Sequence, residues 1–384
     1  MKIGFFTECY HDTNNGVVTS MDTFRRSLKE RGHQVYVIAP NNGHEDNDPD
    51  VIRLPSLRVH HDYPPAITLL AHSQIRRIKG LGLDVIHCQH LGILGRLGLK
   101  IGRQLGIPVI YTYHTLLTEY VHYFYWFPIP GKWKVKIAVW LSRNFCNKVD
   151  QVVTPSQPMK DILLPYGVTQ PIEVIPTGIN IADFAHPYSR EELKSAWNIP
   201  EDRKILLYVS RLAKEKNLDF LFEAVRILRQ KRNDFHLLMV GGGPELGYFQ
   251  KRVKDLGLQD CVTFTGEQKK PGVNRFFGAG YTFTFPSPSE TQGIVATESM
   301  AAGVPAVAIN RMGPSDIIRN GVDGFLTSLN PPEFSGRIEQ LLDDETLRKK
   351  MGDQARRSAE RFSIETCTDK MEKLYETTIS RHRS

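Results

Sequence analysis

The chain has 384 residues, of which 41% are hydrophobic and 24% are charged, and its formal net charge is +7. This composition excludes a disordered or fibrous protein, and the length predicts two ordinary domains. The sequence has no run of about 18 apolar residues, so we expect no membrane-spanning helix. The positive charge suits nucleic acid, an anionic membrane surface or a phosphorylated substrate. No zinc-finger, RNP or helix-turn-helix signature is visible, so we expect no nucleic-acid partner.

The five cysteines are scattered and include no Cys-x-x-Cys pair. Their odd number and their spacing argue against a disulfide framework or a zinc site and fit a reducing compartment, so we expect no metal. The first residues, Met1 to Glu8, reach an acidic side chain too early for a signal peptide and predict a β-strand instead.

Short apolar segments alternate with helical segments in the first half of the chain. Thr19 to Arg31 has helical spacing and is followed by Gly32, which suits the end of a helix. The expected strands here are Lys2–Thr7, Gln34–Ala39, Val85–His87, Val109–Thr112, Asp150–Thr154 and Ile172–Ile175. Apolar strands that alternate with helices are typical of a parallel sheet covered on both faces.

A second series of the same kind begins after the loop Pro176–Asn180. Leu218 to Arg232 predicts a helix, and the charged segment Asp343–Lys373 is helical in composition. The expected strands are Lys204–Val209, Phe235–Val240, Val262–Phe264, Tyr281–Phe285 and, as the last of the series, Pro305–Ile309.

The predicted fold class is therefore α/β, with two doubly wound Rossmann-like domains. We expect them to comprise residues 1–180 and 181–361, with a C-terminal helix of residues 362–384 that returns to the first domain. Ligands of such sheets bind at the carboxyl ends of the strands, so the predicted site is a cleft between the domains.

Two glutamates, Glu290 and Glu298, flank seven residues that we expect to end a loop and begin a helix. A helix N-terminus near Thr291 to Ile294 presents free N–H groups and a positive dipole end to an anion. We expect Glu290 to hold sugar hydroxyls and Glu298 to hold a ribose, which together describe a sugar-nucleotide pocket. The alternative is an ordinary capped helix with two surface glutamates.

Further candidate residues follow predicted strands. Arg211 and Lys216 supply two cations that can clamp a diphosphate leaving group, or they belong to a solvated turn. The run Gly241–Gly243 allows a close backbone approach to a ligand, or simply makes a tight turn. His114 follows the strand Val109–Thr112 and is expected to face the cleft, unless it is a packed structural residue.

Gly16 follows the first strand and allows backbone N–H groups to approach a phosphate, or belongs to a plain turn. The surrounding segment Asn14–Val17 is not the Gly-x-Gly-x-x-Gly pattern of dinucleotide binding. A dehydrogenase is therefore a weak alternative.

Several of these motifs occur in an order that resembles glycosyltransferase family 4, whose members are retaining enzymes with the GT-B fold. The motifs are Asn15-Gly16, His114, Ser210-Arg211 with Lys216, Gly241–Pro244, Thr265-Gly266, Phe285-Pro286-Ser287 and Glu290-x7-Glu298. The resemblance covers nearly the whole chain. It implies a nucleotide-diphosphate sugar as the donor substrate and no obligatory metal or other cofactor.

The resemblance also implies roles for individual residues. Arg211 and Lys216 hold the diphosphate, Glu298 the ribose and Glu290 the sugar, and His114 lies near the reacting centre. The implied catalytic residues are His114, Arg211, Lys216 and Glu290, and the implied donor-binding residues are Gly16, Ser210, Arg211, Lys216, Gly241, Gly242, Thr265, Gly266, Gln292, Gly293, Ile294 and Glu298. In such enzymes the leaving phosphate itself deprotonates the acceptor. Gln292 departs from the family, which more often has Phe at this position.

Within the family, the segment from His114 to Gly131 is similar to that of bacterial enzymes that glucosylate diacylglycerol. This implies transfer of a hexose, expected to be glucose from UDP-glucose, to a lipid acceptor. The alternatives are phosphatidylinositol, a soluble sugar or a polysaccharide as acceptor, and a non-catalytic module that binds sugar nucleotides.

The residues themselves agree with a lipid acceptor. An aromatic run, Tyr123–Phe127, precedes a basic amphipathic stretch of the kind that lies on anionic bilayers. That stretch contains Lys132, Trp133, Val135, Lys136, Val139, Trp140, Arg143, Phe145 and Lys148. The expected membrane or acceptor contacts are Tyr123, Phe124, Trp126, Trp133, Lys136 and Trp140. We therefore expect a peripheral protein at the cytoplasmic face of the membrane; the alternative is an ordinary helix packed on the sheet.

Overall fold

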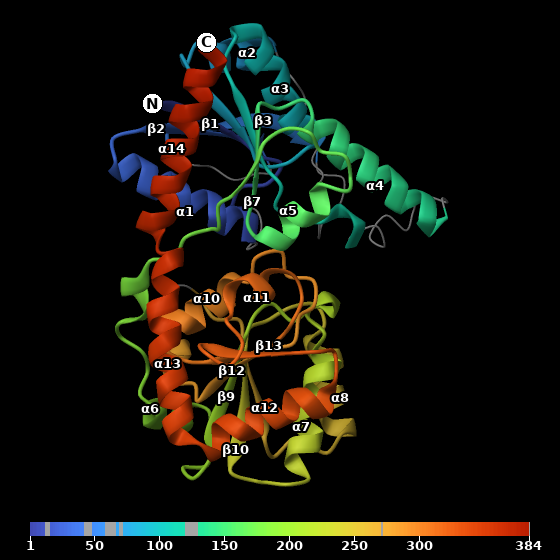
Figure 1. Cartoon of the computed structure of the whole chain (residues 1–384), viewed down its shortest axis with the longest axis vertical. Coiled ribbons are helices and arrows are strands. Elements are labelled where there is room, and N and C mark those ends of the chain that lie inside the picture. The colour runs from blue at the N-terminus through green and yellow to red at the C-terminus, as the bar shows by residue number, and fades with distance from the viewer. Residues whose placement is uncertain are drawn as a thin grey trace. The chain divides into compact units, whose positions relative to one another are not determined.

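The computed structural model describes residues 1–11, 16–41, 48–57, 67–68, 72–119, 130–269 and 272–383. The chain forms two compact units. The first comprises Met1–Gly178 together with Ile364–Ser384, and the second comprises Ile179–Ser363 (Figure 1). The C-terminal helix thus belongs to the unit that contains the N-terminus.

The first unit is built on one sheet, and its described strands lie in the order β4-β3-β2-β1-β5-β6-β7-β8. Neighbouring strands are parallel except for β3 and β4. The strands are β1 (Lys2–Phe6), β2 (Gln34–Asn41), β3 (Val51–Leu57), β4 (Ile67–Thr68), β5 (Val85–Cys88), β6 (Val109–Thr112), β7 (Gln151–Thr154) and β8 (Ile172–Val174). The order reverses between β1 and β5, which is where doubly wound sheets bind their ligands.

Helices cover this sheet, and its central strands are buried throughout. The helices are α1 (Gly16–Glu30), α2 (His72–Lys79), α3 (Ile93–Leu105), α4 (Gly131–Cys146), α5 (Gln157–Leu163) and α14 (Ile364–Arg383), with a 3-10 turn at Leu117–Glu119. Phe24 of α1 and Met371 of α14 share one apolar core with Phe5 of β1.

Polar contacts attach α14 to the rest of the first unit. The Arg31 guanidinium and the His33 ring contact the Glu372 carboxylate at 2.9 and 2.7 Å. In the core, Tyr375 Oη shares a hydrogen bond of 2.7 Å with His87 Nδ1. These partners explain why the last helix packs here although it follows the second unit in sequence.

The second unit contains a parallel sheet whose described strands lie in the order β11-β10-β9-β12-β13-β14. The strands are β9 (Lys204–Val209), β10 (Phe235–Val240), β11 (Val262–Gly266), β12 (Thr282–Phe285), β13 (Ala306–Ile309) and β14 (Gly324–Thr327). The order reverses between β9 and β12. This reversal point predicts the ligand position of the second unit.

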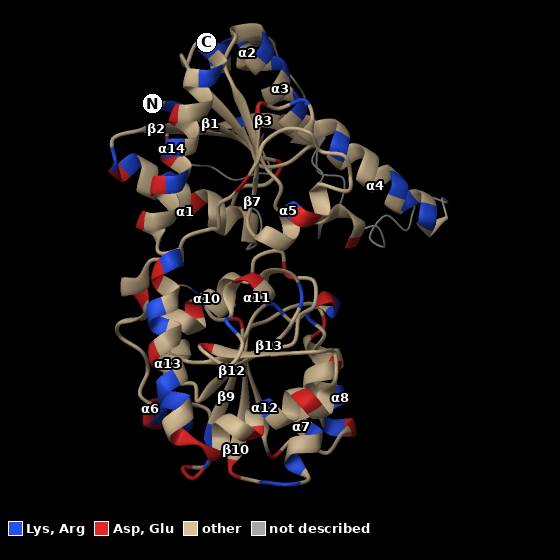
Figure 2. Ribbon diagram, viewed as in Figure 1, with Lys and Arg blue, Asp and Glu red and all other residues tan. Residues whose placement is uncertain are grey.

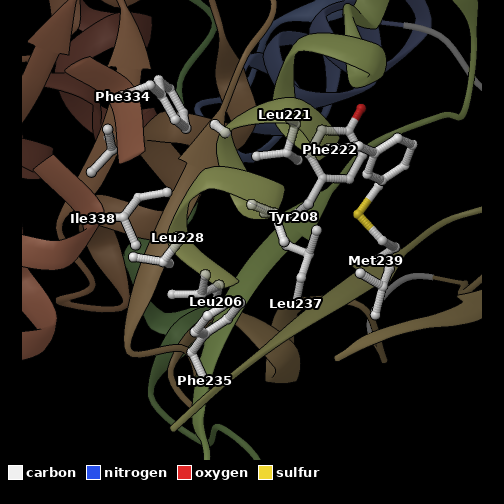
Figure 3. Close-up of a cluster of buried hydrophobic side chains, with 14 of the residues drawn as sticks. Leu206, Tyr208, Leu221, Phe222, Leu228, Phe235, Leu237, Met239, Phe334 and Ile338 are labelled. Atoms are coloured by element: carbon white, nitrogen blue, oxygen red, sulfur yellow. The ribbon is translucent and has the colours of Figure 1, made fainter. Parts of the chain in front are cut away.

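Apolar helix faces cover both sides of this second sheet. The helices are α6 (Arg190–Ala196), α7 (Leu218–Arg229), α8 (Leu246–Asp255), α9 (Asn274–Phe277), α10 (Ile294–Ala301), α11 (Met312–Ile317), α12 (Pro331–Asp343) and α13 (Glu345–Ala359), with 3-10 turns at Ile181–Phe184, Lys214–Lys216 and Glu360–Phe362. Figure 3 shows one core, in which Leu206 and Leu237 of the sheet meet Phe222 of α7 and Ile338 of α12. Met300 of α10 belongs to a second core, with Phe283 of the sheet.

The predicted strands of both series are confirmed, with small shifts at their ends. Three predictions were wrong. Helix α1 begins at Gly16 rather than Thr19, and α7 ends at Arg229 rather than Arg232. Pro305–Ile309 is not the last strand, because β14 follows it. Strand β3 was missed because Pro55 within it argues against a strand in a sheet interior.

Candidate functional site

Two loops meet where the strand order of the second unit reverses. The segment Ser210–Asn217 follows β9, and the segment Pro286–Gly293 follows β12. Asn217 Nδ2 donates to the carbonyl of Pro286 at 3.1 Å, and the hydroxyls of Ser287 and Ser289 donate to the carbonyl of Glu215 at 3.3 and 3.4 Å. The two loops are thereby held as one surface.

The two predicted cations of this surface have acidic partners. Arg211 Nη2 lies 2.5 Å from Glu215 Oε1, and Lys216 Nζ forms an ion pair with Glu290 Oε1. The side chains of Lys216 and Glu290 are 15% and 23% exposed, so their attraction is only partly screened by solvent. The structure thus brings together the residue expected to hold the diphosphate and the residue expected to hold the sugar.

The glycine run after β10 packs against the loop after β9. Gly241 and Gly243 have φ angles of +140° and +155°. A Cβ on Gly241 would lie 2.1 Å from the carbonyl oxygen of Ser210, and one on Gly243 would lie 2.3 Å from that of Leu212. The glycines therefore permit a close crossing of two loops, and Leu212 N–H donates to the Gly242 carbonyl at 2.8 Å.

The predicted pair Thr265-Gly266 ends β11 at the same edge of the sheet. Gly241 N–H donates to the Gly266 carbonyl at 3.1 Å, and Gly266 has a φ angle of +74°. The loops after β9, β10 and β11 therefore form one backbone network, which contains Ser210 and the predicted glycines Gly241, Gly242 and Gly266.

The predicted helix start near Thr291 to Ile294 is confirmed. Helix α10 begins at Ile294, and Gly293 precedes it with a φ angle of +86° and no side-chain cap. Gln292 and Glu298 are 5% and 4% exposed. The burial of Glu298 excludes the alternative of two ordinary surface glutamates.

Gly313, in helix α11 after β13, supports this loop and was not predicted from the sequence. Gly313 N–H donates to the Glu290 carbonyl at 2.8 Å. A Cβ on Gly313 would lie 2.0 Å from the carbonyl oxygen of Gln292, and the preceding Met312 has a φ angle of +50°. The signal was a Met-Gly-Pro sequence directly after a predicted strand.

The corresponding edge of the first unit holds three histidines and a glutamine. His87 lies in β5, Gln89 and His90 follow β5, and His114 follows β6. His87, Gln89 and His114 line a small pocket together with Ser20, Thr112 and Thr177. Apolar side chains such as Phe5, Phe24 and Met371 complete the lining, and the pocket lies at the carboxyl ends of β5 and β6.

The histidines of this edge are neutral. Burial lowers the pKa of His87 to about 3 and that of His90 to about 4. Burial, together with the nearby His90 and His87, holds the pKa of His114 well below its ordinary value. His114 Nε2 lies 2.8 Å from Gln89 Oε1. Gly16 is exposed at the start of α1, and its neighbour Asn15 lies outside the described residues.

Helix α4 presents an exposed stripe of aromatic and aliphatic side chains. In Figure 1 it extends away from the sheet of its unit, and Figure 2 shows basic residues along it. Trp133, Ile137 and Trp140, spaced for one helix face, are 59%, 42% and 52% exposed. Lys136 Nζ lies 5.0 Å from the centre of the Trp133 ring.

Other residues of the predicted segment lie elsewhere or cannot be placed. Phe145, which belongs to the predicted amphipathic stretch but not to the expected membrane contacts, is 5% exposed and packs on the Tyr111 ring, with 4.7 Å between ring centres. It lies on the inner face of α4. Tyr123, Phe124 and Trp126 lie outside the described residues.

In the described part of the chain, no cluster of three or more His, Cys, Asp or Glu residues is placed to hold a metal ion. The described helices include none that is long and apolar enough to cross a membrane. The five cysteines, all within the described residues, form no disulfide, and all are buried.

Two protein-family models match the chain: Glycosyltransferase Family 4 over residues 14–183, and Glycosyl transferases group 1 over residues 189–358. An alpha-monoglucosyldiacylglycerol synthase of Streptococcus pneumoniae is 34% identical over 85% of this chain and 75% of its own. An Acholeplasma laidlawii enzyme of the same name is 28% identical over 80% of each chain. A GDP-mannose-dependent alpha-mannosyltransferase of Mycolicibacterium smegmatis is 27% identical over 99% of this chain and 98% of its own.

Solved structures show the same fold at low sequence identity. HepE of Anabaena, crystallised with UDP, has a TM-score of 0.79 at 17% identity and covers 98% of this chain and 100% of its own. A sucrose-phosphate synthase of Thermosynechococcus elongatus has a TM-score of 0.76 at 20% identity and covers 99% of each chain. The predicted architecture of two Rossmann-like domains is confirmed.

Proposed function

The chain belongs to glycosyltransferase family 4 and has its GT-B fold, and we propose that it transfers glucose from UDP-glucose to diacylglycerol. The products are UDP and a membrane glycolipid. The observation that carries the lipid acceptor is the exposed Trp133–Ile137–Trp140 stripe of α4, in a chain related to monoglucosyldiacylglycerol synthases.

The donor is proposed to bind at the reversal point of the second sheet. Arg211 and Lys216 bind the diphosphate there, because guanidinium and ammonium groups pair with phosphate oxygens and stabilise the charge that develops on a leaving group. Their contacts with Glu215 and Glu290 must then loosen or rearrange. Glu290 turns to the sugar hydroxyls, and the buried Glu298 accepts from the ribose hydroxyls.

Backbone groups complete the proposed donor site. The N–H groups of Gln292, Gly293 and Ile294 lie at the start of α10, where free donors and the helix dipole favour an anion. Ser210, Gly241, Gly242, Thr265 and Gly266 shape the loops beside them. Gly16 is proposed as a further donor-binding residue, because glycine lets backbone N–H groups approach a phosphate. The proposal requires no metal ion, so activity should survive a chelator.

In the proposed reaction, the bond between the sugar C1 and the β-phosphate oxygen breaks, and a bond from C1 to the acceptor oxygen forms on the same face. The acceptor hydroxyl proton moves to the leaving phosphate, so no protein base is required. His114 lies near the reacting centre as a neutral imidazole. The configuration at C1 is retained.

The lipid acceptor is proposed to be reached from the membrane surface at its cytoplasmic face. Exposed tryptophans enter the headgroup region readily, and Lys132, Lys134 and Lys136 add positive charge that anionic lipids attract. A peripheral location explains how a chain can meet an acceptor that does not leave the bilayer.

Another sugar or acceptor is the second candidate function. One relative is named for GDP-mannose, and Gln292 stands where the family more often has Phe. The test is to incubate the enzyme with UDP-glucose, UDP-galactose and GDP-mannose, each with vesicles that contain diacylglycerol and anionic lipid, and to follow nucleotide release and glycolipid together. UDP-glucose alone should give both. Nucleotide release without glycolipid would reject diacylglycerol, and glycolipid from another donor would reject glucose.

A further inference from the structure

We propose that Gln89 is a positioning residue that fixes the imidazole of His114 in its Nε2–H form, so that Nδ1 accepts a hydrogen bond from a substrate hydroxyl. The proposal rests on the proposed function for the substrate, but the state of the ring belongs to the protein alone. Both residues lie at the carboxyl ends of β5 and β6, where they line the small pocket of the first unit.

The geometry around Gln89 is well defined. Gln89 is 4% exposed, and its backbone N–H donates to the Phe6 carbonyl of β1 at 2.8 Å. This bond crosses the point at which the strand order reverses. The side-chain oxygen Oε1 lies 2.8 Å from Nε2 of His114. Gln89 is therefore anchored in the sheet, and its carboxamide orients the neighbouring ring.

The chemistry of the two groups sets the direction of this hydrogen bond. A carboxamide oxygen can only accept, so Nε2 of His114 must carry the hydrogen. A neutral imidazole has one N–H, which leaves Nδ1 with a lone pair. His114 can then accept a hydrogen bond at Nδ1, whereas a protonated ring could only donate.

The charged and titratable neighbours keep the ring neutral. Burial is the largest cause of the lowered pKa of His114, and His90 and His87 contribute less. Burial raises the pKa of the Glu8 carboxyl, which accepts from the Leu94 N–H at 2.7 Å, at the start of α3. His90 accepts the Glu8 backbone N–H at Nδ1, at 3.2 Å, which fixes its ring as well.

The first experiment observes the ring without any substrate. Nitrogen-15 NMR of labelled histidine, with His114→Asn to assign the signal, reports which ring nitrogen carries hydrogen. Between about pH 6 and pH 8, wild type should show the Nε2–H form. Gln89→Leu should lose this preference, and Gln89→Glu should show a doubly protonated ring at neutral pH, because a carboxylate stabilises the cation. An Nδ1–H ring in wild type, or an unchanged ring in Gln89→Leu, would overturn the proposal.

The second experiment measures transfer from UDP-glucose to diacylglycerol against pH. Gln89→Leu should lose at least about tenfold in kcat at every pH, because the acceptor at Nδ1 is no longer fixed. Gln89→Glu keeps an oxygen that accepts from Nε2, so its activity should fall at neutral pH and recover at higher pH. A pH profile of Gln89→Glu that matches wild type would contradict the proposal, since a merely structural role of Gln89 predicts no such shift.

The hydroxyl itself is located by comparing two rates in Gln89→Leu. The two rates are the slow hydrolysis of UDP-glucose without lipid and the transfer of glucose to lipid. If both rates fall equally, the hydroxyl that bonds to Nδ1 belongs to the donor sugar. If only the transfer rate falls, the hydroxyl belongs to the acceptor. No loss in either rate would overturn the role of Nδ1. If wild type transfers no sugar to any lipid, the proposed function fails, while the NMR result still decides the state of the ring.

Discussion

Lys216 and Glu290 form an ion pair across the reversal point of the second sheet, although they are 74 residues apart in the sequence. Each is expected to contact a different part of the donor. A donor that binds both residues must therefore separate them, and part of its binding energy offsets the lost ion pair. The ion pair holds both side chains at the site, and the donor then replaces it with contacts of Lys216 to the diphosphate and of Glu290 to the sugar.

This relationship predicts opposite effects on UDP binding for the two partners. Glu290→Gln frees Lys216 for the diphosphate, so the Kd for UDP should stay the same or fall, while transfer of glucose should drop because the sugar loses a carboxylate partner. Isothermal titration with UDP and an assay of transfer measure the two effects. Weaker binding of UDP by Glu290→Gln would contradict the exchange of partners.

Lys216→Met should weaken the binding of UDP and reduce kcat/KM by roughly 100- to 1,000-fold, because a cation that stabilises the leaving diphosphate is lost. The matched control is Lys214→Met in the same turn, where the Lys214 side chain is 84% exposed. It should leave both values close to wild type. Equal losses in the two variants would show that general positive charge, rather than Lys216, is responsible.

We expect the single methyl group added by Gly313→Ala to have a strong effect on activity. In Gly313→Ala the new Cβ would lie 2.0 Å from the Gln292 carbonyl, so the loop must shift. Because the loop carries Glu290, we expect kcat/KM for UDP-glucose to fall, on the order of 100-fold for a displacement of about 1 Å.

The control for this variant is Gly336→Ala in helix α12, where no atom other than its chain neighbours and the backbone of its own helix lies within 4 Å of the new Cβ. It should leave activity unchanged and raise the thermal midpoint slightly, because alanine favours a helix by about 1 kcal/mol over glycine. Unchanged kinetics in Gly313→Ala would show that the loop tolerates the shift.

The exposed stripe of α4 predicts binding to vesicles. Replacing both Trp133 and Trp140 by alanine should reduce binding to anionic vesicles by at least about tenfold, because two large apolar side chains no longer enter the interface. Co-sedimentation measures this, and wild-type binding should weaken as salt rises. Tyr248→Ala, which removes an aromatic side chain that is 52% exposed on α8 of the second unit, is the control. Equal binding by the double variant and wild type would reject α4 as the contact.

The lowered pKa of His87 predicts that the stability of the protein depends on pH. Its pKa is about 3 in the folded protein, whereas the ordinary value is 6.5. Between these values the unfolded chain binds the proton and the folded chain does not, so the free energy of unfolding falls as the pH falls. From pH 7.5 to pH 5 this residue contributes a loss of about 2 kcal/mol.

Thermal unfolding at the two pH values measures the effect. His87→Gln should lose less stability than wild type between pH 7.5 and pH 5. The exposed His186 provides the control, and His186→Gln should behave like wild type. An identical pH dependence in wild type and His87→Gln would contradict the account.

The fold was largely predictable because the apolar strands and the helices between them are local patterns. Strand β14 was missed because four residues, Gly-Phe-Leu-Thr, carry little periodic signal. The site was predictable in its residue types but not in its partners. The contacts of Lys216 with Glu290 and of Gln89 with His114 join the ends of different strands, and only the order of the strands in each sheet brings them together. The requirement for glycine at Gly313 likewise depends on the carbonyl of Gln292, which is close in space but comes from another loop of the sequence.

The most direct test is to incubate the purified protein with UDP-glucose and anionic vesicles that contain diacylglycerol, and to analyse the extracted lipids by mass spectrometry and NMR. We predict that wild type forms glucosyl-diacylglycerol with the α-configuration of the donor, and that this product is nearly lost in Lys216→Met. No glucosyl-diacylglycerol from the wild-type protein, under conditions in which a related synthase forms it, would contradict the proposed function.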